Sequence, residues 1–153
     1  MSSPDRPVHQ LRVVVEAEDF DVAVRFYRDV LGLPEQAAFE GEGDARVVIL
    51  DAGRATLELA NPAQKRMIDS VEAGGHVSER IRLAFEVDDT STSTEALREA
   101  GATVVAPPTE TPWRSLNARL DGPAGLQLTL FQELESVDRR RDRKGFGTEG
   151  DRA

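Results

Sequence analysis

The feature that most constrains the fold is an internal repeat with an offset of 70 residues. Charged residues recur at this offset with unchanged identity: Arg12 as Arg82, Glu16 as Glu86, Asp19 as Asp89 and Arg28 as Arg98. Four charged identities at one offset are not expected by chance, and a fixed period is the signature of a repeated structural unit. The chain is therefore predicted to contain two copies of one module.

Each module is predicted to have the order β-α-β-β-β. Residues 11–17 are rich in β-branched side chains, which favours a strand. Asp19 or Asp21 can cap the helix that is expected over 22–31, and Gly32 follows where a left-handed C-terminal cap is typical. Turn-forming residues then separate three further strands, expected over 36–40, 45–50 and 55–60.

The second module follows the same plan after a connector. Its first strand is expected over 81–87 and its helix over 90–100, and the connector contains a short predicted helix over 62–72. We therefore expect an α+β fold in a single domain over 10–132. The predicted divisions are a flexible N-terminus 1–9, module one 10–60, connector 61–79, module two 80–132 and a basic, disordered tail 133–153.

Charge narrows the classes of partner. The formal net charge of the 153 residues is −9, and residues 138–153 carry six Arg or Lys against four acids, which leaves 13 bases and 24 acids in the rest. An acidic body repels phosphate backbones, so nucleic-acid binding is not expected. No apolar run approaches the roughly 20 residues that span a bilayer, and the start of the chain lacks an apolar signal core, so we expect a cytoplasmic protein without membrane contact.

Three stretches of the chain resemble one known superfamily. They are DFDVAVRFYRDVLGL at 19–33, AFEVDD at 84–89 and DGPAGLQLTL at 121–130. These stretches resemble the vicinal oxygen chelate superfamily, which contains glyoxalase I, extradiol dioxygenases and bleomycin resistance proteins, and the resemblance covers about 11–132. It implies a curved, U-shaped mixed sheet made by two tandem modules, with helices on the outside, a homodimer, and a small organic molecule bound in the cleft.

The same resemblance implies a divalent metal on four strand positions in catalytic members. Those positions correspond to Arg12, Glu58, Arg82 and Thr129 in this chain. A guanidinium stays protonated and offers no free lone pair, so neither arginine can be a ligand. The chain has no Cys, and its histidines, His9 and His76, have no metal-ligand spacing. No metal or other cofactor is therefore expected, and Glu58 is the one position that keeps a ligand type.

The residues expected to line the cleft alternate along the module strands. They are Arg12, Val14, Glu16, Glu58, Arg82, Glu86, Asn117, Arg119 and Thr129, together with Trp113, which follows a Pro-rich loop over 106–112. Two interpretations remain open. The charged residues can neutralise one another as a clamp across the modules, or an arginine can keep a free donor edge for an anionic ligand group.

The leading functional hypothesis is a metal-independent protein that binds or sequesters a small molecule, similar to bleomycin resistance proteins. The alternative is a metal-dependent lyase or dioxygenase of the same superfamily that uses Glu58 with atypical ligands. A further alternative is a dimeric structural or regulatory protein whose cleft is filled by its own side chains. Enzymatic activity is thus an open question, and the sequence favours a binding protein.

Overall fold

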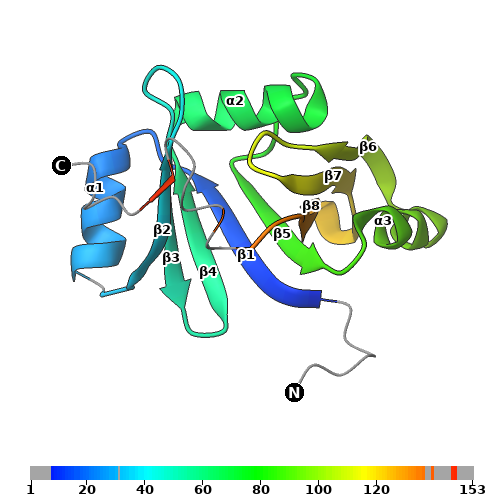
Figure 1. The fold of residues 1–153 in the computed structure, drawn as a ribbon, viewed down its shortest axis with the longest axis horizontal. Coiled ribbons are helices and arrows are strands. Elements are labelled where there is room, and N and C mark those ends of the chain that lie inside the picture. Colours follow the sequence, from blue (N-terminus) through cyan, green and yellow to red (C-terminus); the bar gives the residue numbers. More distant parts are fainter. Residues whose placement is uncertain (1–7, 31, 137–138, 140–145, 148–153) are drawn as a thin grey trace.

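The computed structural model describes residues 8–30, 32–136, 139 and 146–147. Its strands form one curved sheet in the order β6-β7-β8-β5-β1-β4-β3-β2-β9 (Figure 1). The strands are β1 Val8–Glu16, β2 Glu35–Glu40, β3 Arg46–Ala52, β4 Ala55–Ala60, β5 Ile81–Val87, β6 Thr103–Glu110, β7 Ser115–Asp121, β8 Gln127–Glu133 and β9 Phe146–Gly147. The helices are α1 Phe20–Val24, the π-helix η1 Arg25–Val30, α2 Pro62–Ala73, α3 Thr90–Glu99 and the 3-10 turn η2 Pro123–Gly125. The α+β class is confirmed.

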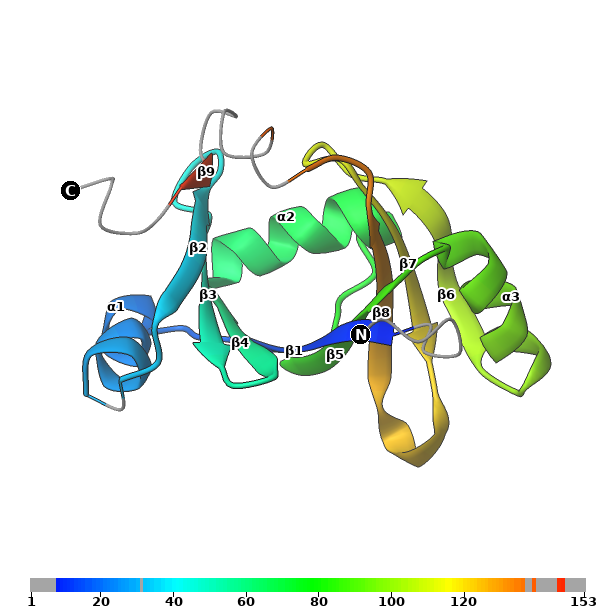
Figure 2. The same cartoon turned by 60° about the horizontal axis from the view of Figure 1, so that its bottom comes forward.

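The two modules meet at the centre of the sheet. Strand β1 pairs antiparallel with β5, and each pairs in parallel with the last large strand of its own module, β1 with β4 and β5 with β8. In this register Arg12 lies opposite Ala84 and Val14 lies opposite Arg82. The arrangement confirms the two tandem modules, and Figure 2 shows the sheet bent into the predicted U.

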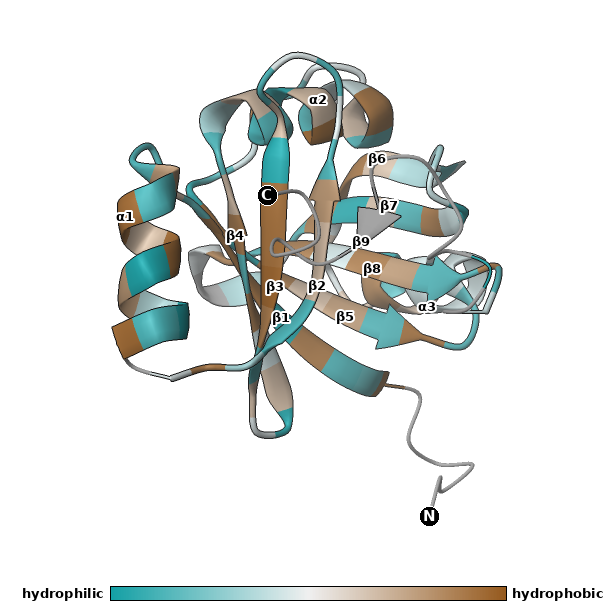
Figure 3. Ribbon diagram, turned by 60° about the vertical axis from the view of Figure 1, so that its left-hand side comes forward, coloured by the Kyte–Doolittle hydropathy of each residue, from teal (hydrophilic) through white to brown (hydrophobic). Residues whose placement is uncertain are grey.

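The outer face of the sheet carries the apolar core. Phe20 and Val24 of α1 pack against Val48 and Leu50 of β3, and α3 covers the corresponding face of the second module. Hydrophobic residues fill much of β3 and the middle of β1 (Figure 3). Since side chains alternate along a strand, burying one face in this way turns the neighbouring positions toward the inside of the U. Helices α1 and α3 lie on the outside, as predicted.

The connector helix α2 lies across the mouth of the U (Figure 2). It contacts β3 and β4 on one side and β6 and β7 on the other. Asn61 caps its first turn by accepting a hydrogen bond from the Gln64 N–H at 2.9 Å, and Gly74 ends it with a φ of 59°. The helix expected over 62–72 is confirmed, and its position adds a polar roof to the cleft.

The first helix differs in detail from the sequence expectation. Asp19 is the cap, and its carboxylate accepts a hydrogen bond from the Val22 N–H at 3.3 Å. The α-helix then widens into the π-helix η1 after Val24, in place of one regular helix over 22–31. Gly32 takes a φ of 89°, as its expected role as a left-handed cap requires.

The Pro-rich segment 106–112 is mostly not a loop. Residues up to Glu110 belong to β6, which is the edge strand of the sheet. An edge strand tolerates proline because one of its sides has no neighbouring strand that needs a backbone N–H donor. The pairing with β7 shifts between Ala106 and Thr109, where the two prolines stand. The prediction of a loop is therefore wrong for residues 106–110, because the two prolines stand on an edge strand at a point where the pairing is already interrupted.

Both ends of the chain are more ordered than expected where the structure describes them. Strand β1 begins at Val8, so the last two residues of the expected flexible N-terminus 1–9 belong to the sheet. In the expected disordered tail 133–153, residues 146–147 form β9 and pair antiparallel with Ala38 and Phe39 of β2. Most of the remaining tail lies outside the described residues. None of the helices in the described part of the chain is long and apolar enough to cross a membrane.

Candidate functional site: a cavity between the sheet and the connector helix

A cavity of about 110 Å³ lies between the inner face of the sheet and α2. Since one water needs only about 10–15 Å³ by this kind of measure, the space holds several waters or a small organic group. The sequence-predicted cleft residues at its wall are Arg12, Val14, Glu58, Arg82, Trp113, Asn117 and Thr129. The structure therefore brings together seven of the ten side chains expected in the cleft, from both modules.

Three expected cleft residues lie elsewhere. Glu16 lines a smaller hollow beside the main cavity. Glu86 is partly buried and lies opposite Gln10 of β1, away from the cavity wall. Arg119 is fully buried behind the wall, where α2 covers it. Strand alternation alone does not decide which side chains reach the cavity, because Glu16 lines a separate hollow and α2 covers Arg119.

The connector supplies cavity residues that the sequence did not single out. Gln64, Ile68 and Glu72 of α2 line the roof. Gln64 is 2 % exposed, and its side-chain oxygen Oε1 has no hydrogen-bond partner among the described residues. Their spacing of four residues is the signal that places them on one helix face, but the sequence does not say that this face covers the cleft.

Arg12 forms a pair with Glu58 within module one. Its Nη1 lies 3.5 Å from Glu58 Oε1, its Nε donates to Gln10 Oε1 at 2.6 Å, and its guanidinium carbon lies 4.9 Å from the centre of the Phe131 ring. Strand pairing explains the contact, because the parallel register puts β4 directly beside β1. The Glu58 carboxylate, the remaining metal-ligand type, thus faces a cation.

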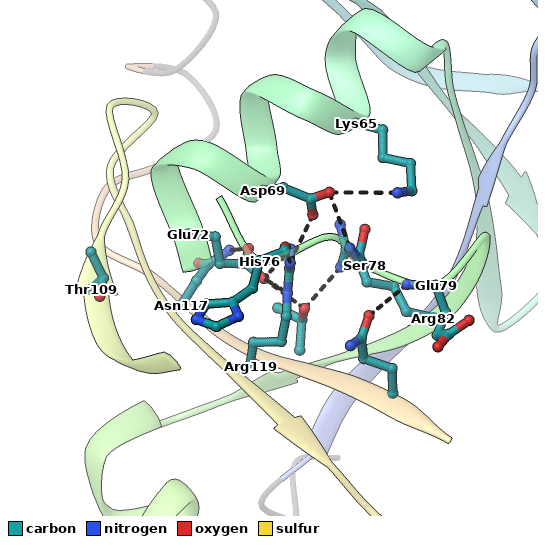
Figure 4. Close-up of polar contacts among 12 residues, drawn as sticks. Lys65, Asp69, Glu72, His76, Ser78, Glu79, Arg82, Thr109, Asn117 and Arg119 are labelled. Atoms are coloured by element: carbon teal, nitrogen blue, oxygen red, sulfur yellow. Dashed lines mark hydrogen bonds and ion pairs between the residues drawn. The ribbon is translucent and has the colours of Figure 1, made fainter. Parts of the chain in front are cut away.

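Arg119 is held by two carboxylates of α2 (Figure 4). Its Nη1 donates to Asp69 Oδ1 at 2.7 Å and to the His76 carbonyl at 3.2 Å, and its Nε donates to Glu72 Oε1 at 3.1 Å. Asp69 also accepts from the Ser78 N–H at 3.1 Å. This buried cluster fastens the roof helix to β7.

Hydrogen bonds and burial shift the pKa of Asp69 in opposite directions, and the hydrogen bonds have the larger combined effect. Burial acts to raise the pKa of this carboxyl, whereas hydrogen bonds from Ser78 and Arg119 and the charge of Arg119 lower it, and the pKa lies below its ordinary value. Asp69 is therefore held in its charged form, which the pairing with a permanently charged guanidinium requires.

Glu72 connects the cluster to the cavity wall. Besides Arg119 it accepts hydrogen bonds from Thr129 Oγ1 at 2.8 Å and from Asn117 Nδ2 at 2.8 Å. Thr129 Oγ1 in turn accepts from Arg82 Nη1 at 2.9 Å. A chain of polar contacts therefore runs from the roof helix through β8 to the floor strand β5.

The clamp considered from the sequence is not built as expected. Arg12 pairs with Glu58 inside its own module, and within the described residues neither Glu16 nor Glu86 forms an ion pair with an arginine of the floor. Arg119 of β7 pairs instead with Asp69 and Glu72 of the connector helix α2. Helix α2 holds both of its carboxylates within hydrogen-bond distance of Arg119, at 2.7 and 3.1 Å.

The donor set at the four strand positions does not fit a metal. Two guanidiniums, one hydroxyl already bonded to Glu72, and one carboxylate facing Arg12 offer no group of anionic or imidazole ligands. No group of three or more His, Cys, Asp or Glu side chains suited to a metal ion occurs in the ranges that the structure describes. His9 contacts Asp88 at the surface, and His76 is exposed beyond α2.

Comparison with known proteins gives a family and a fold. A sequence model described as "Glyoxalase-like domain" matches residues 12–131. No curated protein sequence matches the chain. A structure of a glyoxalase/bleomycin resistance protein/dioxygenase superfamily member from Vibrio splendidus has a TM-score of 0.58 at 14% identity, covering 81% of this chain and 98% of its own. Methylmalonyl-CoA epimerase from Mycobacterium tuberculosis has a TM-score of 0.57 at 19% identity, covering 87% and 91%.

A third structure holds a bound small molecule. It is methylmalonyl-CoA epimerase from Streptomyces coelicolor in complex with 2-nitronate-propionyl-CoA, with a TM-score of 0.57 at 20% identity, covering 84% of this chain and 98% of its own. At these identities the likeness shows the shared fold.

Proposed function

This chain belongs to the glyoxalase-like domain family of the vicinal oxygen chelate superfamily, and from that premise we propose that it binds or sequesters a small organic molecule without a metal. The observation that carries the proposal is that Arg12 and Arg82 line the cavity at strand positions where the superfamily resemblance implies metal ligands. A cation at this place would meet two guanidinium charges and one carboxylate that is already paired.

The cavity suits a ligand with both apolar and polar parts. Apolar wall is provided by Phe39, Val47 and Ile49 of module one, and Trp113 of module two lines the same cavity. Polar groups converge on the same space from the floor and the roof. An apolar pocket with a few placed polar groups is the usual form of a small-molecule site.

Native mass spectrometry of the freshly purified protein tests this proposal. We expect an assembly mass that includes one small organic molecule per cavity and no stoichiometric divalent ion. A stoichiometric metal whose removal abolishes ligand binding or turnover would contradict the proposal. The same spectrum tests the expected homodimer, and the absence of nucleic acid and a cytoplasmic location are parts of the proposal that remain open to experiment.

A second candidate is an enzyme that uses Glu58. It is favoured by one observation: Glu58 lines the cavity, and its one described polar contact is the 3.5 Å approach of Arg12, which leaves an oxygen for a substrate proton. Glu58→Gln would then abolish turnover while ligand binding persists. On the binding proposal the same substitution changes affinity or stability, and no turnover exists to lose.

A further inference from the structure

We infer that Arg82 is the anion-recognition residue of the cavity and that the ligand is a small organic acid with one carboxylate and an apolar body. The inference rests on the proposed function, because it assigns the ligand class of the same cavity. The three arginines on the inner side of the sheet, Arg12, Arg82 and Arg119, differ in how their charges are compensated.

Two of the three arginines have carboxylate partners. Arg119 lies against Asp69 and Glu72, and Arg12 lies against Glu58. Arg82 differs from both. It is 7 % exposed, and within the described residues its one polar contact is the hydrogen bond that Nη1 donates to the Thr129 hydroxyl, with no carboxylate within 4.0 Å.

A buried guanidinium without a counter-ion is costly. A guanidinium cannot lower this cost by losing its proton, because arginine stays charged in proteins. One hydroxyl acceptor satisfies one of its five N–H donors and none of its charge. Since Arg82 lines the cavity, the group best able to meet the remaining donors is an anion inside the cavity. A planar carboxylate matches the fork of a guanidinium with two parallel hydrogen bonds.

The surroundings limit the ligand further. Glu58 and Glu72 also line the cavity, so a second anionic group on the ligand would approach carboxylates and would be repelled. The roof offers Gln64 Oε1, a buried acceptor without a described partner, which suits a hydroxyl or amino donor on the ligand. The apolar wall suits a hydrocarbon or aromatic body. These features together describe a monocarboxylic acid.

The test compares benzoate with benzamide, which share the ring and differ in charge. Trp113 is the single tryptophan and lies at the cavity, so its fluorescence reports binding of either probe. We expect wild-type protein to bind benzoate at least about tenfold more tightly than benzamide, as loss of charge-assisted hydrogen bonds implies. Arg82→Met and Arg82→Gln should lose this preference. Arg54→Gln, the same charge change at an exposed turn between β3 and β4, should keep it.

Three binding results would overturn the inference. They are equal affinity of wild-type protein for the two probes, binding of neither probe, and an intact benzoate preference in the Arg82 variants. Failure of both Arg82 variants to fold would overturn it as well, because removal of an uncompensated buried charge should not unfold the protein. A small molecule found by native mass spectrometry alongside any of these results would leave the proposed function standing, whereas its absence would remove both.

Discussion

Glu72 accepts hydrogen bonds from three side chains on the inner side of the sheet. Its carboxylate accepts hydrogen bonds from Asn117, Thr129 and Arg119, and it is 2 % exposed. A buried carboxylate that serves one cation and two neutral donors is satisfied only as long as all its partners stay in place. Removing this carboxylate is therefore expected to destabilise the protein, because its three donors lose their acceptor.

Substituting Glu72→Gln keeps the shape and removes the charge. Arg119 would keep Asp69 but lose half of its charge compensation, and we expect the free energy of unfolding to fall by about 3 kcal/mol, as for other broken buried pairs. Urea denaturation measures this loss. Glu99→Gln makes the same change at an exposed helix position and should stay within about 0.5 kcal/mol of wild type. Equal stability of the two variants would mean that the cluster does not hold the helix.

Asp69 gives the cluster a pH dependence. Its pKa is lowered in the folded protein, so the stability it contributes is fully present above the ordinary carboxyl pKa of about 3.9 and is lost as the pH falls through the lower folded value. The difference in unfolding free energy between wild type and Asp69→Asn should therefore shrink as urea titrations move from pH 6 toward acid, below about pH 4. A difference that stays constant down to the acid limit would contradict the assigned charge state.

At this scale the sequence predicted part of the site. Strand parity puts Arg12 and Arg82 on corresponding faces of their strands, and the superfamily resemblance implies that this face, with Glu58 and Thr129, forms the cleft; all four residues line the cavity. The role of Glu72 could not be predicted, because neither its own helix nor its neighbours in sequence show which strand it meets. Ion pairing across distant elements depends on how the roof helix docks, which local patterns do not encode.

Helix α2 is the element that turns an open cleft into a roofed cavity. Its cap residue Asn61 accepts from the N–H groups of Gln64 and Arg46 and donates to the Asp44 carbonyl. The cap therefore joins the start of the helix to the turn before β3 as well as closing its first turn. Helix α2 is thus held by the hydrogen bonds of Asn61 at its start and by the Arg119 cluster near its end.

Removing the cap should loosen the roof. Asn61→Ala leaves two backbone N–H groups without their acceptor, and we expect a loss of about 2 kcal/mol in the free energy of unfolding, the upper end for a cap residue. Thermal or urea denaturation measures it. Ser70→Ala, at an exposed position of the same helix, should change stability by no more than about 0.5 kcal/mol. An Asn61→Ala loss no greater than this control would show that the cap does not anchor α2.

The type of an element, strand or helix, could be predicted from the local sequence. The place of a strand in the sheet could not. The strand of 81–87 agrees with the sequence expectation because it repeats the pattern of the first strand. The connector helix agrees with it because Pro62 marks its first turn and Gly74 its end. The Pro-rich part of β6 was missed because whether a proline is tolerated depends on the strand being at the edge, which is a property of the whole sheet.

The whole molecule has its family's fold, and the proposal concerns the chemistry of its cleft. The repeat puts a central strand from each module side by side, so the same positions, Arg12 and Arg82, face the cavity from both. In the catalytic relatives that the resemblance implies, these positions hold metal ligands. Here they carry fixed positive charge, and the most direct consequence is that divalent cations should be rejected.

Calorimetric titration of the purified, chelator-treated protein with Mn²⁺, Fe²⁺, Ni²⁺ and Zn²⁺ tests the central claim of metal-independent binding. We predict no stoichiometric metal uptake, and a benzoate affinity measured by Trp113 fluorescence that is the same with and without each ion. Uptake of one metal ion per chain that creates or greatly strengthens ligand binding would contradict the account.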